Sequence, residues 1–91
     1  MNMREKMTAI ELLEKLVSFK TVSRDSNLDL INFVEEYLNS FGIHSHKVYD
    51  ATGEKAAIYA NIGPKSHGGI ILSGHSDVVP VDGQDWNTDP F

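Results

Sequence analysis

The chain has 91 residues, with 8 Lys and Arg against 13 Asp and Glu, a formal net charge of −5 and 41% apolar residues. This composition predicts a globular, mildly acidic chain of at most one domain with a small core. The chain has no cysteine, which excludes disulfides and thiolate zinc clusters. Because its apolar runs are far shorter than the ~20 residues of a membrane helix and its first residues do not resemble a secretory signal, we expect a soluble, cytoplasmic protein.

The charge is unevenly distributed along the chain. Residues 1–74 are nearly balanced, with 9 acidic and 8 basic residues, whereas residues 75–91 contain four aspartates and no Lys or Arg. Phosphate binding needs clustered cations, so we expect no nucleic-acid partner. The acidic segment is better suited to cations, including metal ions.

A first amphipathic helix is predicted over about residues 9–19. Thr8 and Glu11 have the spacing of a capping box, which is typical of a helix start. The apolar residues that follow recur at helical intervals and are expected to be core: Ile10, Leu13, Leu16 and Val17.

A second helix is predicted over about residues 27–40. Ser26 and Asp29 have the spacing of a second capping box, and Gly42 is placed to end the helix in the left-handed conformation. The apolar stripe of this helix is also expected to be core: Leu30, Val34, Tyr37, Leu38 and Phe41.

Three strands are predicted after the helices. Residues 43–49 alternate with a period of two, but neither face is uniformly apolar, which is typical of an edge strand. Asp50–Gly53 has turn chemistry, so residues 55–62 are expected to form a second strand, antiparallel to the first. A third strand is expected at Gly69–Ser73, because Ile70–Leu72 is apolar on both faces, as in the central strands of α/β sheets.

The expected fold class is therefore α/β, with two N-terminal helices followed by three strands (ααβββ) and both helices against one face of the sheet. The sequence offers no further helix to cover the other face of the sheet. We therefore expect residues 1–91 to form the incomplete start of a larger domain.

A His-x-Asp triplet follows the predicted third strand. Ligands of open α/β sheets bind at the carboxyl ends of strands, and residues two apart in extended backbone share a side, so His75 and Asp77 are expected to be neighbours. A neutral imidazole can bind a metal ion through one nitrogen while the other donates its proton to a carboxylate. His75 would then be the ligand and Asp77 the carboxylate that orients it. By spacing alone, a loop in which Asp77 only accepts from backbone amides is equally compatible.

The segment from Leu72 to Phe91, with Gly74-His-Ser-Asp77 near its start, resembles the first metal-site motif of a two-zinc amidohydrolase family. This family includes acetylornithine deacetylase, succinyl-diaminopimelate desuccinylase, aminoacylase and glutamate carboxypeptidase. The part from Val78 to Trp86 is most similar to acetylornithine deacetylase. Residues Leu12–Ser23 are similar to the family's opening helix and the loop after it, so the resemblance covers nearly the whole chain. Ser76 stands where many members have threonine.

The resemblance implies a zinc-exopeptidase-like catalytic domain, of which residues 1–91 would be the N-terminal part, without the family's inserted dimerisation domain. It makes His75 a ligand of one of two zinc ions, with cobalt as an alternative metal, and Asp77 the catalytic-site carboxylate that orients it. It assigns no substrate-binding residue, and the family's general base and remaining ligands would lie beyond Phe91. We therefore expect residues 1–91 alone to be inactive.

The activity that the resemblance implies is metal-dependent hydrolysis of the amide bond of a small N-acyl amino acid by a homodimeric parent enzyme. The favoured reaction converts N-acetylornithine to ornithine and acetate in arginine biosynthesis. The alternatives within the family are succinyl-diaminopimelate desuccinylase and a dipeptidase. Outside this activity, the alternatives are a non-catalytic metal-binding or interaction fragment and an independent small ligand-binding domain.

The other residues that carry polar or aromatic chemistry have structural explanations. His44 and His46 are expected on the solvent face of an edge strand, and His67 in an exposed turn. Trp86 and Phe91 are expected to pin the last loop to the rest of the protein. This loop holds three further aspartates, which are expected to be solvated or to cap backbone amides: Asp82, Asp85 and Asp89.

Overall fold

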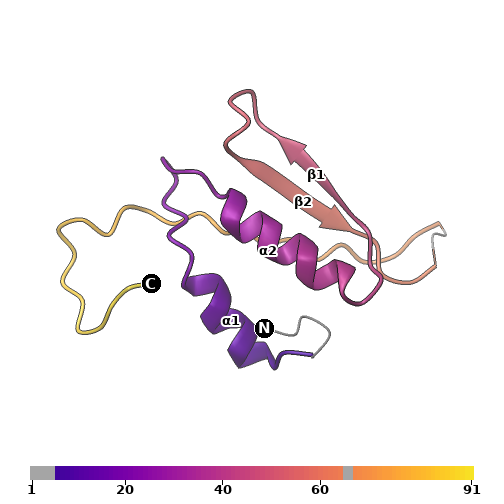
Figure 1. Cartoon of the computed structure of the whole chain (residues 1–91), viewed down its shortest axis with the longest axis horizontal. Helices are drawn as coiled ribbons and strands as arrows, with labels where there is room; N and C mark the ends of the chain where they lie inside the picture. Colours follow the sequence, from indigo (N-terminus) through magenta and orange to yellow (C-terminus); the bar gives the residue numbers. More distant parts are fainter. Residues whose placement is uncertain (1–5, 65–66) are drawn as a thin grey trace.

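The computed structural model describes residues 6–64 and 67–91. It contains two helices, α1 (Ala9–Val17) and α2 (Leu28–Asn39), followed by two strands, β1 (Ser45–Tyr49) and β2 (Ala56–Ala60). Figure 1 shows α2 lying along the β1–β2 hairpin, α1 lying apart from the hairpin, and a long C-terminal segment that crosses behind α2. No helix in the described part of the chain combines the length and the apolar character needed to cross a membrane.

Helix α1 begins as predicted and ends two residues before the predicted end. The Thr8 hydroxyl accepts a hydrogen bond from the Glu11 backbone N–H, and the Glu11 carboxylate accepts one from the Thr8 N–H, both at 3.1 Å. This reciprocal pair confirms the capping box. The expectation that the α1 stripe is core is wrong, because no residue of α1 is buried and Ile10 and Leu13 are exposed. Leu16 of this stripe is partly buried against the core formed by α2 and β2.

Helix α2 lies within one residue of its predicted bounds, but it does not begin as predicted. Ser26 and Asp29 form no capping box. Instead the Ser26 hydroxyl accepts from the Leu28 N–H at 3.2 Å and donates to the Glu54 carbonyl at 2.6 Å, which links the helix start to the hairpin. Gly42 has a φ of +73° and confirms the left-handed end.

Strands β1 and β2 pair in the predicted antiparallel hairpin and are shorter than predicted. Lys47 lies opposite Ile58 on the face that meets α2, and His46 lies opposite Tyr59 on the exposed face. Asp50 and Gly53 close the connecting turn through a backbone hydrogen bond of 3.1 Å. Gly53 has a φ of +74°, which favours glycine there.

The core is small and lies between α2 and β2. Leu30 and Ile31 of α2 are buried against Ala56 of β2. Partly buried apolar side chains surround this contact: Leu16, Phe19, Leu28, Val34 and Ile58. The α2 stripe is therefore core only along one part of its length, since Phe41 at its end is exposed.

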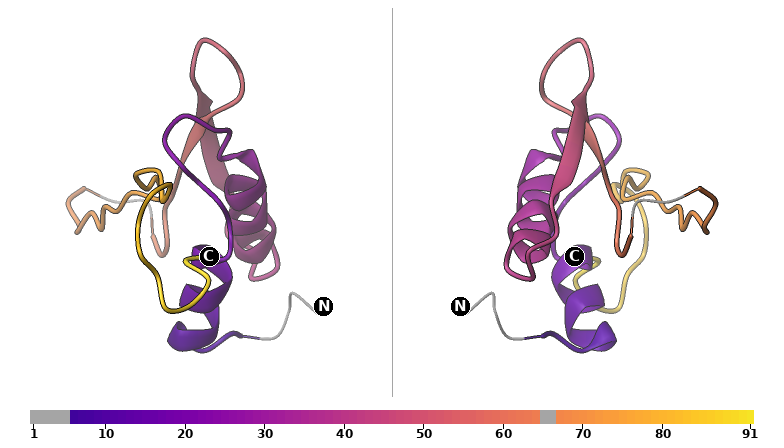
Figure 2. Two further views of the ribbon diagram at one scale, coloured as in Figure 1. Left: turned by 90° about the vertical axis from the view of Figure 1, so that its left-hand side faces the viewer. Right: turned by 90° about the vertical axis from the view of Figure 1, so that its right-hand side faces the viewer.

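The predicted third strand at Gly69–Ser73 is not confirmed. This segment pairs with no strand, and its side chains Ile70, Ile71 and Leu72 are 90–94% exposed. In the two views of Figure 2 the segment runs outside the helices and the hairpin. An apolar run becomes a central strand only where neighbouring strands pair with both of its edges and other layers cover its faces. Among the described residues the sheet has two strands, so the observed order is ααββ.

A short parallel pairing joins the loop after α1 to the segment that carries His75 and Asp77. Val22 and Val78 form an isolated parallel bridge. The Val78 N–H donates to the Thr21 carbonyl and the Ser23 N–H donates to the Val78 carbonyl, both at 2.9 Å. These bonds fix residues 76–78 beside residues 21–23, although more than 50 residues separate the two segments in the chain.

Candidate metal site

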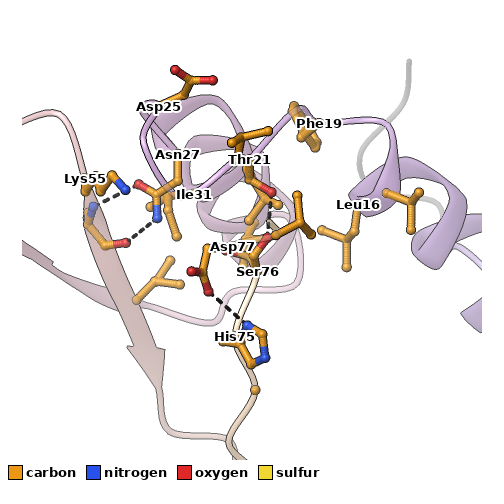
Figure 3. Close-up of a pocket in the computed structure, with 18 of the residues that line it drawn as sticks. Leu16, Phe19, Thr21, Asp25, Asn27, Ile31, Lys55, His75, Ser76 and Asp77 are labelled. Carbon is orange, nitrogen blue, oxygen red and sulfur yellow. Dashed lines mark hydrogen bonds and ion pairs between the residues drawn. The ribbon is translucent and has the colours of Figure 1, made fainter. Parts of the chain in front are cut away.

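The structure brings the two site residues predicted from sequence into direct contact. Nδ1 of His75 lies 2.9 Å from Oδ1 of Asp77. Figure 3 marks this contact between the two side chains with a dashed line. An ionised carboxylate only accepts hydrogen bonds, so Nδ1 carries the proton in this contact. In the neutral ring, Nε2 then keeps its lone pair and is the atom able to bind a metal ion.

The second carboxylate oxygen of Asp77 is also engaged. The Ser23 hydroxyl donates to Oδ2 of Asp77 at 2.8 Å. This hydrogen bond, and after it the contact with His75, lowers the pKa of the Asp77 carboxyl below its ordinary value. Asp77 is therefore ionised at neutral pH and can orient the imidazole.

The backbone between the two site residues is held from the same loop. The buried Thr21 hydroxyl donates to the Ser76 carbonyl at 2.6 Å. Thr21 and Ser23 are thus site residues that the sequence analysis missed. The available signal in the sequence was the order Thr21-Val22-Ser23, in which two polar residues flank an apolar one. Their partners lie 55 and 54 residues away, and a single sequence does not show such contacts.

The site does not follow a strand as predicted, because Gly69–Ser73 is not one. Its side chains are open to solvent, 84% exposed for His75 and 58% for Asp77. Both residues border a hollow of about 800 Å³ whose other walls are mainly apolar side chains of α1, α2 and β2 (Figure 3). This hollow is the uncovered side of the core rather than a closed pocket.

The donor atoms fit one position of a zinc site. Imidazole nitrogen is a common zinc ligand, and a carboxylate on the other ring nitrogen is its usual support. A catalytic zinc normally has three protein ligands. Within residues 6–64 and 67–91, no three His, Cys, Asp or Glu side chains are grouped so that they could hold a metal ion. The described residues therefore offer one donor atom suited to zinc, Nε2 of His75, beside the carboxylate of Asp77.

The other histidines lie away from this site. His46 stacks on Tyr59 across the hairpin, with ring centroids 4.9 Å apart. His44 and His67 are exposed, as expected.

Asp85 and Asp89 of the C-terminal loop behave as expected, whereas Asp82 pairs with an arginine. Asp82 forms an ion pair of 3.1 Å with Arg24, which follows the site residue Ser23. Asp89 accepts from the Phe91 N–H at 2.9 Å, and Asp85 is exposed. Both partners of the Asp82–Arg24 pair are largely exposed, so the pair contributes little to stability.

The two aromatic residues of this loop differ in placement. Phe91 is partly buried and lines the hollow beside α1, as expected for a residue that pins the loop. Trp86 does not follow this expectation, because it is 53% exposed and its indole N–H donates only to Gln84, two residues away, at 2.8 Å.

Comparison with curated proteins identifies several relatives. The chain is 38% identical over 85 residues to a succinyl-diaminopimelate desuccinylase from Nautilia profundicola, covering 93% of this chain and 22% of that protein. It is 36% identical over 89 residues to an acetylornithine deacetylase from Pectobacterium carotovorum, covering 90% of this chain and 23% of that protein. It is also 32% identical over 89 residues to an acetylornithine deacetylase from Shigella sonnei.

The matches cover nearly all of this chain but only a small part of each relative. The chain spans less than a quarter of the length of the curated relatives it matches, 22% of one and 24% of another. No family model matches the chain, and no solved structure matches it significantly. The matched region contains His75 and Asp77 together with the loop that supports them.

Proposed function

The chain belongs to the family of acetylornithine deacetylase and succinyl-diaminopimelate desuccinylase, and on this premise we propose that the complete protein hydrolyses the amide bond of an N-acyl amino acid. N-acetylornithine is the favoured substrate, because the segment from Val78 to Trp86 is most similar to acetylornithine deacetylase. The products would be ornithine and acetate, in arginine biosynthesis. N-succinyl-diaminopimelate is the second candidate, because a relative at 38% identity is named a desuccinylase.

We also propose that residues 1–91 form the N-terminal part of the catalytic domain of a cytoplasmic homodimer. Within this domain His75 would hold one of two zinc ions, or cobalt, through Nε2. The observation that carries this proposal is the contact of 2.9 Å between His75 and Asp77, which leaves Nε2 as the ring's available donor. Other residues of the complete protein would provide the remaining ligands.

The chemistry divides between the metal and the side chains of this chain. Bound zinc would activate a water molecule and stabilise the negative charge that develops on the carbonyl oxygen. Asp77 keeps the proton on Nδ1 of His75 and holds the ring in one orientation. We assign no general base among the described residues, and a water activated by metal needs one to take its proton. Hydrolysis by residues 1–91 alone is therefore not expected.

The direct test is His75→Ala in the complete protein, with His67→Ala as the matched control. Loss of a metal ligand should lower kcat/KM by about 100-fold or more and reduce the metal content, since even supporting residues are worth 10–100-fold. His67 is an exposed loop histidine, so His67→Ala should keep both the kcat/KM and the metal content of the unmodified protein. Unchanged activity and metal content in His75→Ala would refute the assignment.

The substrate is tested by comparing kcat/KM for N-acetylornithine and N-succinyl-diaminopimelate. Higher kcat/KM for the first supports the favoured assignment, and higher kcat/KM for the second supports the alternative. A complete protein that binds zinc through His75 but hydrolyses neither compound would be a non-catalytic metal-binding member of the family.

A further inference from the structure

The two oxygens of the Asp77 carboxylate have different partners. Oδ1 contacts Nδ1 of His75 at 2.9 Å, and Oδ2 accepts from the Ser23 hydroxyl at 2.8 Å. A carboxylate held at both oxygens cannot rotate about its last bond without losing one of these contacts. The orientation of Asp77, and with it that of the imidazole, is therefore coupled to Ser23.

Ser23 is itself firmly placed. Its N–H donates to the Val78 carbonyl at 2.9 Å, within the parallel pairing that also includes Thr21. The residue before it, Val22, is buried. The Ser23 hydroxyl also lies 3.2 Å from the Val78 carbonyl oxygen, but it has one proton, and the shorter contact to an ionised acceptor is the stronger one.

We propose that Ser23 is a positioning residue for His75, which acts by clamping the Asp77 carboxylate so that the imidazole keeps its proton on Nδ1 and presents Nε2. The effect on the ring tautomer depends only on these contacts. The consequence for metal binding rests on the proposed function. A loop more than fifty residues earlier in the chain therefore decides which nitrogen of His75 is available.

The tautomer is measured by long-range ¹H–¹⁵N NMR of the His75 ring in residues 1–91, at a pH where the ring is neutral. We expect the Nδ1–H form to dominate in the unmodified chain and the Nε2–H form to increase several-fold in Ser23→Ala. Ser23→Thr keeps the hydroxyl and should restore the original ratio. Ser73→Ala removes an exposed hydroxyl from the same segment as His75 and should change nothing.

The amide signals of residue 23 and Val78 show whether the backbone pairing survives in each variant, because these two N–H groups donate its hydrogen bonds. Asp77→Ala removes the same link from the other side and should shift the tautomer in the same direction. An unchanged tautomer ratio in Ser23→Ala, with the pairing intact or lost, would overturn the proposal.

The second measurement is the Kd for Zn²⁺ of the complete protein, where Ser23→Ala should weaken binding on the order of 10-fold and Ser23→Thr should not. If His75→Ala abolishes zinc binding while Ser23→Ala leaves the tautomer unchanged, the positioning role fails and the proposed metal ligand stands. If Ser23→Ala shifts the tautomer but His75→Ala leaves zinc binding unchanged, the positioning role stands and the proposed function fails.

Discussion

Asn27 shows how one side chain joins two elements of this small fold. Its amide Nδ2 donates to the Ala56 carbonyl, and its Oδ1 accepts from the Ala56 N–H, both at 2.9 Å. The side chain thus occupies the edge of β2 as a neighbouring strand would. Ala56 is buried, so these backbone groups have little access to water if Asn27 is removed.

We expect Asn27→Ala to lower the free energy of unfolding by about 2 kcal/mol, because a buried donor and acceptor would lose their partner. Urea unfolding of residues 1–91 measures the change. Asn32→Ala replaces an exposed asparagine of the same helix and should raise stability slightly, by about 0.5 kcal/mol, through helix propensity. Equal effects of the two substitutions would contradict this role of Asn27.

Sequence reasoning succeeded for residue pairs that are close in the chain. His75 and Asp77 were predicted to be neighbours because side chains two residues apart in extended backbone share a side, and they meet at 2.9 Å. Asn27 with Ala56, and Ser23 with Asp77, were not predicted. Their contacts depend on how distant segments pack, which the spacing along one sequence does not specify.

At the scale of elements, the start of α1 is stabilised by a group that titrates. Thr8 lowers the pKa of Glu11 below its ordinary 4.5, through its side chain first and its backbone N–H second. The folded state therefore binds this proton less readily than the unfolded state. The resulting stabilisation is present above about pH 4.5 and is lost as the pH falls through the lower folded value.

We therefore expect the first turn of α1 to fray as the pH is lowered below about 4.5, through the lowered pKa of Glu11. Glu11→Gln retains a hydrogen-bonding side chain at this position and does not titrate, so its first turn should respond less to pH. The amide chemical shifts of residues 9–12 report the change. An identical pH response in both proteins would show that Glu11 has no part in it.

Removing the Thr8 cap tests how far it stabilises α1. Thr8→Ala removes the acceptor for the Glu11 N–H and should cost about 1 kcal/mol of helix stability. Far-ultraviolet circular dichroism measures the loss of helix. Helix α1 contributes no buried residue, whereas α2 has buried residues and no side-chain hydrogen bond from its N-cap residue. The stability of α1 therefore depends more on its cap, and that of α2 more on packing.

The two helices also show what an amphipathic pattern predicts. Both stripes indicated helices, and both helices form within two residues of their expected ends. The pattern does not identify the surface that covers the stripe. That surface is β2 for α2, whereas the apolar face of α1 remains largely exposed.

At the scale of the whole molecule, the apolar run Ile70–Leu72 is almost fully exposed. Contiguous exposed apolar surface binds hydrophobic dyes and is unusual in small proteins. We expect residues 1–91 to enhance the fluorescence of such a dye and the Ile71→Ser, Leu72→Ser double variant to enhance it much less. Val48 is an exposed apolar residue of the hairpin, outside the run Ile70–Leu72, so Val48→Ser should leave the signal nearly unchanged. Equal signals from all three proteins would contradict this expectation.

The sequence by itself determined the local features of this protein. The α1 cap, both helices, the left-handed Gly42, the hairpin turn and the adjacency of His75 and Asp77 all follow from residues a few positions apart. The tertiary structure decided what depends on distant partners. It left Gly69–Ser73 unpaired, and it placed Thr21 and Ser23 beside the site. The physical reason is that a strand needs neighbours to pair with its backbone and a carboxylate needs a donor to orient it, and neither partner is specified by local sequence.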